Sequence, residues 1–75
     1  MKQKPLINEA DIGKKIKSLR NAKRITLERL ALQTGFTKGY LSKVEASAKA
    51  PPISTLGIIA RALGSNISTL LGEDS

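Results

Sequence analysis

The sequence predicts an all-α fold, a compact bundle of five short helices. Apolar residues recur at spacings of three and four in successive segments, as on one face of an α-helix. Helix-capping residues and glycines separate these segments at short intervals. No segment alternates apolar and polar residues as a half-buried strand would. With 75 residues the chain can hold one domain, and its core must be aliphatic because it contains one Phe, one Tyr and no Trp.

The first part of the chain predicts a terminal arm followed by a helix. Residues 1–10 are polar and show no periodicity, so we expect a flexible basic arm there. The first helix should begin near Asp11, whose carboxylate can cap free amides, and should fray near residues 22–23. Its apolar stripe consists of Ile12, Ile16 and Leu19.

Two capped segments follow at short range. Thr26 precedes LERLALQT and can cap a second helix, which Gly35 should end in a left-handed conformation. Thr37 can cap a third helix over about residues 38–46, and the loop SAKAPP comes next. A steep crossing of these two helices is expected because only about three residues join them. It needs a small residue at the close approach, which Ala31 supplies. This pattern is typical of a helix-turn-helix, whose second helix is free to enter a major groove.

The end of the chain predicts two more helices and a tail. ISTLGIIARAL gives the fourth helix, which Gly64 ends, and Asn66 caps a short fifth segment. The helical domain therefore spans residues 11–72, with a tail at 73–75. The residues that should return to the core from the fifth segment are Ile67, Leu70 and Leu71.

The composition restricts the class of function. Thirteen Lys and Arg residues against six Asp and Glu give a net charge of +7 and a pI near 10.2. Such a chain attracts polyanions, although a solvated basic face has the same composition. Without Cys or His, the chain lacks thiolate ligands and the commonest general base, so we expect no metal, no cofactor and no enzymatic activity. No apolar run is long enough for a membrane span, and no export signal precedes the charged segment, so we expect a cytoplasmic protein.

Three stretches of the sequence resemble one family. IKSLR, TLERLALQTGFTKGYLSKVE and ISTLGIIARALGSNISTLL are similar to the Cro and phage-repressor type of helix-turn-helix, also called the xenobiotic-response-element family. The resemblance covers residues 12–71. It implies a lambda-repressor-like fold and a bacterial or phage transcriptional regulator, such as a repressor. TLERLA followed by GYLSKVE especially resembles regulators in which this domain precedes a cupin sensor domain. One architecture that this implies is the N-terminal part of a cupin-type regulator.

The resemblance also implies which residues meet DNA. The recognition helix, about residues 37–46, would lie in the major groove of double-stranded DNA. The positions that match base-facing ones are Lys38, Gly39, Ser42 and Lys43. Lysine can donate to guanine O6 and N7, whereas Gly39 would permit close approach or leave a base unread. For Lys38 we favour a base contact over a phosphate contact or free solvation. For Lys43 these alternatives stay open.

Phosphate contacts would come from the edges of the same surface. Thr26 and Thr37 are expected to contribute with the free amides at their helix starts, together with Lys49 in the following loop. Tyr40 has two equal interpretations, packing at the helix edge or a hydroxyl bond to phosphate. A separate pair, Arg20 and Glu45, matches positions at which the family joins its first and third helices, so we interpret this pair as structural.

Four residues depart from the family pattern. Leu27 stands where the family often has a DNA-contacting Gln, and Ser47 stands where Gly usually ends the third helix. A left-handed Ser47 would cost about 1 kcal/mol relative to Gly. Leu32 and Ile58 occupy positions that are usually polar, as surface residues or as part of a partner interface.

Two functions therefore remain to be distinguished. The first is sequence-specific DNA binding, with a homodimer on a palindromic operator. The alternative is a protein-interaction module, such as an antitoxin or adaptor, that uses the same fold. An interaction module could lose Lys38 and Lys43 without penalty, whereas a DNA reader could not.

Overall fold

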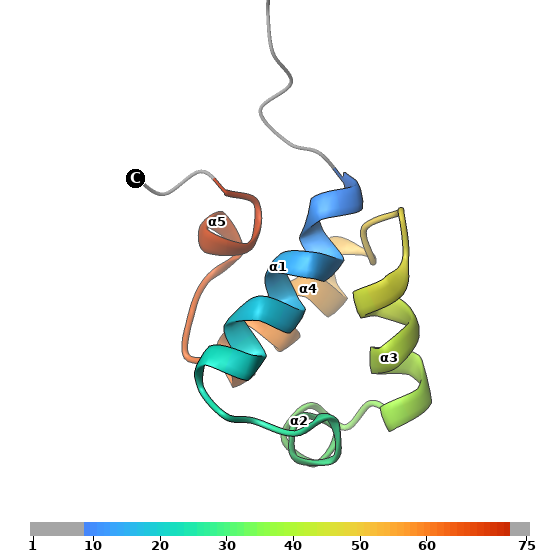
Figure 1. Ribbon diagram of the computed structural model, residues 1–75. Coiled ribbons are helices and arrows are strands. Elements are labelled where there is room, and N and C mark those ends of the chain that lie inside the picture. Colours follow the sequence, from blue (N-terminus) through green and yellow to red (C-terminus); the bar gives the residue numbers. More distant parts are fainter. Residues whose placement is uncertain (1–8, 73–75) are drawn as a thin grey trace, which may run out of the picture.

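The predicted all-α bundle is confirmed in a computed structural model that describes residues 9–72 (Figure 1). This part of the chain contains no strand. Its five helices are α1 (Glu9–Ala22), α2 (Leu27–Thr34), α3 (Lys38–Ala46), α4 (Ile53–Ala62) and α5 (Ile67–Leu70). Figure 1 shows α2 nearly end-on and α3 from the side, so the two helices cross steeply, as the short connection between them requires.

The first helix begins two residues earlier than the sequence predicted. Glu9 lies in α1 and not in an arm, and its Oε1 accepts a hydrogen bond from the backbone N–H of Ala50 at 3.0 Å. This contact joins the first turn of α1 to the loop after α3, and its two residues are 41 positions apart in the sequence. The remainder of the expected arm and the tail, residues 1–8 and 73–75, lies outside the described residues.

Three predicted N-caps are confirmed. Thr26 Oγ1 accepts from the Arg29 amide at 3.1 Å, and Thr37 Oγ1 accepts from the Tyr40 amide at 3.0 Å. Asn66 Oδ1 accepts from the Thr69 amide at 2.9 Å. Each cap satisfies an amide that has no partner within its own helix, and so fixes where the helix starts.

The expected strain at Ser47 is wrong. Ser47 is extended, with φ −76° and ψ 146°, so no left-handed conformation is needed. Its amide donates to the Val44 carbonyl at 3.3 Å, and its Oγ accepts from the Lys49 amide at 2.9 Å. The chain therefore leaves α3 through a serine-stabilised turn, in which glycine would offer no advantage.

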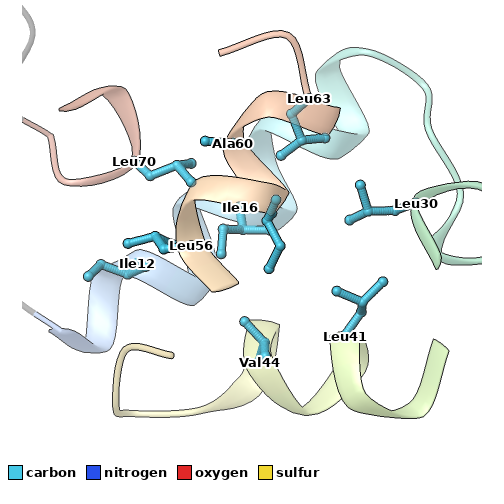
Figure 2. Close-up of a cluster of buried hydrophobic side chains, with 10 residues drawn as sticks. Ile12, Ile16, Leu30, Leu41, Val44, Leu56, Ala60, Leu63 and Leu70 are labelled. Atoms are coloured by element: carbon cyan, nitrogen blue, oxygen red, sulfur yellow. The ribbon is translucent and has the colours of Figure 1, made fainter. Parts of the chain in front are cut away.

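The core lies where all five helices meet (Figure 2). Leu30 from α2 and Leu41 from α3 fill the angle between the two crossing helices. Leu27, at the family's Gln position, packs partly buried against this core. The buried apolar residues are Ile12, Ile16, Leu30, Leu41, Val44, Leu56, Ile59, Ala60, Leu63 and Leu70.

Helices α1 and α3 approach each other at a residue without a side chain. A Cβ atom on Gly13 would lie 2.6 Å from the carbonyl oxygens of both Val44 and Glu45. These oxygens belong to the main chain and cannot rotate away. Gly13 therefore sets the distance between α1 and the C-terminal part of α3.

We expect Gly13→Ala to destabilise the domain by about 1–3 kcal/mol, the usual cost of overpacking. Glycine to alanine inside a helix otherwise stabilises by about 1 kcal/mol. Gly57→Ala is the matched control, because a Cβ there meets only the Ile67 side chain at an ordinary 3.5 Å. Urea unfolding of both variants would measure the difference. A Gly13→Ala protein as stable as Gly57→Ala would contradict the close approach.

Candidate nucleic-acid interface

A buried ion pair fixes α3 against α1. Arg20 Nε donates to Glu45 Oε2 at 2.7 Å, and Arg20 Nη2 donates to Glu45 Oε1 at 3.1 Å. The two side chains are 9% and 6% exposed. The third donor, Arg20 Nη1, bonds the Ile25 carbonyl at 2.8 Å, so the same guanidinium also holds the turn before α2. The hydrogen bond that Arg20 donates to Glu45 raises the pKa of Arg20, although burial opposes this shift. The contact that the sequence predicted between Arg20 and Glu45 is therefore present, and it makes two charge-assisted hydrogen bonds, while a third from the same guanidinium goes to Ile25.

The turn between α2 and α3 is closed by its own backbone and one threonine. Gly35 adopts φ 84°, as predicted, and its amide donates to the Ala31 carbonyl at 2.9 Å. A Cβ on Gly35 would have open space around it, so the requirement is for backbone conformation only. Thr34 Oγ1 donates to the Leu30 carbonyl at 2.8 Å and accepts from the Phe36 amide at 3.2 Å. The sequence analysis missed this role of Thr34.

The outer face of α3 carries all four residues expected to face bases. Leu41 and Val44 are buried on the inner face of the helix. The residues expected to face bases are spaced so that they lie together on the opposite side of α3. The exposed residues there are Lys38, Gly39, Ser42 and Lys43.

Lys38 is paired in the free protein. Its Nζ lies 3.1 Å from Glu28 Oε2 in the first turn of α2, with side chains 57% and 67% exposed. The hydrogen bond from Lys38 lowers the pKa of the Glu28 carboxyl, helped by the carboxyl's own backbone amide. The analysis of the sequence did not anticipate this contact. Only the crossing of α2 and α3 brings the two residues together.

Tyr40 packs at the edge of the helix. Its ring meets Phe36 edge-on, with centroids 5.3 Å apart and an interplanar angle of 60°. Tyr40 is partly buried, which supports the packing interpretation and leaves the hydroxyl contact untested. A shallow open hollow runs from this ring past Lys43 and Lys49 to Pro51.

The residues expected at phosphates lie around α3. Thr26 and Thr37 are exposed at the starts of α2 and α3, where their side-chain oxygens accept the capping hydrogen bonds. Lys49 is exposed in the loop after α3, and Ser47 holds the amide of Lys49. Thr37 thus lies at the start of α3 itself, and Lys49 lines the same hollow as Lys43, whereas Thr26 lies at the start of α2.

The described part of the chain offers little for other kinds of site. Within residues 9–72, no group of three or more acidic, His or Cys side chains could hold a metal ion. None of the helices described is both long and apolar enough to cross a membrane.

Comparison with known proteins assigns the family. The sequence pattern of the helix-turn-helix family HTH_3 matches residues 16–70, which include α2, α3 and α4 completely. The chain belongs to this family. This match confirms the resemblance to the Cro and phage-repressor type of helix-turn-helix that the sequence motifs indicated.

Two curated relatives are about one-third identical to this helix-turn-helix chain over the aligned residues. The immunity repressor protein of Bacillus phage phi105 is 33% identical over 64 residues, which cover 85% of this chain and 44% of the repressor. The uncharacterized HTH-type transcriptional regulator YobD of Bacillus subtilis is 34% identical over 58 residues, covering 77% and 52%. The chain therefore spans about half the length of these curated relatives.

Two solved structures share the fold of this chain and are 34% identical to it in sequence. The clp gene regulator ClgR from C. glutamicum superposes with a TM-score of 0.79, covering 93% of this chain and 90% of that one. The N-terminal DNA binding domain of SinR from Bacillus subtilis gives a TM-score of 0.75, covering 88% and 94%. These relatives and neighbours are named as a repressor, as regulators and as a DNA-binding domain, and not as enzymes.

We expect Glu45→Gln to destabilise the helix-turn-helix domain by about 2–3 kcal/mol. The substitution leaves the Arg20 charge buried without its counter-charge, although the pair lies near the surface of a small domain. Glu28→Gln is the matched control, since it removes a carboxylate from an exposed pair that contributes little to stability. Thermal and urea unfolding would measure both. Equal stability of the two variants would show that the buried pair does not hold α3.

Proposed function

We propose that this domain binds double-stranded DNA in a sequence-specific way as the DNA-reading part of a transcriptional regulator. The observation that carries the proposal is the exposed face of α3, which presents Lys38, Gly39, Ser42 and Lys43 while Arg20 and the α2 turn hold the helix from behind. An exposed helix on a rigid scaffold is what major-groove reading requires. The names of the relatives support the same function.

In this proposal Lys38 reaches into the groove, Lys43 contacts either a base or a phosphate, and the borders contact the backbone. Lys38 donates to the acceptors of a guanine, and Ser42 can serve either as donor or as acceptor. Gly39 adds no side chain, and so allows the helix to approach the bases. Thr26 and Thr37, with the adjoining helix-start amides, and Lys49 in its ordered turn are suited to phosphates. Both groups of contacts are proposals from position, exposure and chemistry.

The alternative, a protein-interaction module such as an antitoxin or adaptor, has one observation in its favour. Leu32 on α2 is 85% exposed. DNA binding by a monomer does not require an exposed leucine there, whereas a protein interface could use it. The basic outer face of α3 has no use in that alternative. A downstream cupin domain and a cytoplasmic location stay predictions.

Binding should weaken steeply with salt. If Lys43 and Lys49 of two copies each neutralise one phosphate, log K should fall with log salt at a slope of about −3.6. Affinity would then drop about 100-fold between roughly 50 and 200 mM salt. Fluorescence anisotropy on duplexes from a binding-site selection would measure the slope. An affinity independent of salt, or a selection that returns no shared sequence, would contradict the proposal.

We further propose that two copies bind a palindromic site, with recognition helices one helical turn, about 34 Å, apart. Ile58 on α4 is 45% exposed and lies in the helix after the DNA-facing pair, where it can meet a second copy. Such a small surface should give a weak dimer. Sedimentation at tens of micromolar should show mostly monomer alone and two copies on a palindromic duplex. A tight dimer without DNA that survives Ile58→Lys would exclude this surface.

A further inference from the structure

Glu28 has an unusual place among the acidic residues. Residues 9–72 contain four acids, and Glu45 is committed to the buried pair with Arg20. Glu9 bonds the loop amide of Ala50, and Asp11 lies in the first turn of α1. Glu28 is the acid whose carboxylate contacts a lysine of the outer face of α3. It therefore places a negative charge beside a surface that is otherwise suited to a polyanion.

The pair contributes little to the stability of the fold. More than half of each side chain is exposed, and exposed ion pairs contribute little to folding because water and salt screen them. An acid in the first turn of a helix also suits the helix dipole, but Asp11 shows that such an acid needs no lysine partner. The consequence of the Glu28 contact falls on Lys38 instead.

The contact restricts where the Lys38 ammonium lies. A lysine has a flexible four-carbon stem and three donors, and so can follow any nearby phosphate. With Nζ held 3.1 Å from Glu28 Oε2, one donor is occupied and two remain for other acceptors. The carboxylate repels phosphate but leaves neutral base acceptors, such as guanine O6 and N7, available to the remaining donors.

We propose that Glu28 is a positioning residue that sets sequence specificity, by holding Lys38 for base edges and disfavouring its contact with phosphates. This inference rests on the proposed DNA binding and adds to it a residue outside the recognition helix. Glu28 lowers affinity for all DNA and increases the ratio of affinities between the preferred and a random duplex. The two residues act as a unit, so the effect of Glu28 on specificity requires Lys38.

The contact itself can be tested without DNA. Lys38→Ala should raise the pKa of the Glu28 carboxyl toward its ordinary value, since the hydrogen bond and the charge that favour the ionised form are removed. An NMR titration of the side-chain carboxyl, in the parent protein and the variant, measures this. An unchanged titration would overturn the proposal, because Lys38 would then not be held by Glu28.

The decisive experiment compares Glu28→Gln with Asp11→Asn on a preferred and a random duplex. Both substitutions remove one negative charge, but only Glu28→Gln releases Lys38. Glu28→Gln should bind random DNA more tightly, steepen the salt slope by about 1 for each bound copy, and reduce the ratio of preferred to random affinity about 10-fold. Asp11→Asn should leave that ratio unchanged. Equal ratios in the two variants would overturn the proposal.

A double-mutant cycle then isolates the pair. In a Lys38→Ala background, Glu28→Gln should no longer change the specificity ratio. In a Lys49→Ala background, which weakens all sequences alike, it should still reduce the ratio. The same loss in the Lys38→Ala background would overturn the proposal, because Glu28 would act as a bulk charge. A parent protein that binds duplexes without preference would instead overturn the proposed function, and the assignment of Glu28 with it.

Discussion

The orientation of α3 depends on one guanidinium. Arg20 donates to both oxygens of Glu45 and to the Ile25 carbonyl, and so joins α1, α3 and the turn before α2. Removing these charges from water is costly, and the cost is recovered only while all the hydrogen bonds are made. A rotation of α3 would break the two bonds to Glu45. The arrangement therefore favours one orientation of α3 and makes intermediate ones unfavourable.

Around this contact, local features place the two crossing helices. Thr26 and Thr37 determine where α2 and α3 begin, and Gly35 reverses the chain between them. Leu30 and Leu41 then fill the angle that remains. The outer face of α3 is free for a ligand because the apolar residues of this short helix lie on its other side. The basic surface is thus a consequence of where the core lies.

The features that could be predicted from the sequence are those whose cause lies within a few residues. A threonine cap, a left-handed glycine and an apolar stripe each depend on neighbours in the chain, and these predictions were confirmed at Thr37, Gly35 and Ile16. The exposed face of α3 followed from the same periodicity. Arg20 and Glu45 were found through the resemblance to a family and not from spacing.

Two of the features that were missed, at Glu9 and Glu28, depend on contacts distant in sequence. Glu9 joins the helix because it bonds Ala50, and Glu28 meets Lys38 only after α2 and α3 cross. Ser47 was expected to be strained because the family has glycine there, yet its hydroxyl supports a turn that needs none. No local signal marked the partners of Glu9 and Glu28, whereas the partner of Ser47 lies two residues away. Which base or phosphate each residue of the surface contacts stays a prediction, since these partners belong to the DNA and not to the chain.

The close approach at Gly13 restricts how this sequence can change over time. A bulky side chain that clashes with another side chain can be accommodated by a second substitution that makes room. At Gly13 the obstacle is the carbonyl backbone of Val44 and Glu45, which every amino acid carries. No replacement at those two positions could act as a suppressor. Recovery would require α3 to move, and its exposed basic face would move with it, so drift at this position is coupled to the proposed function.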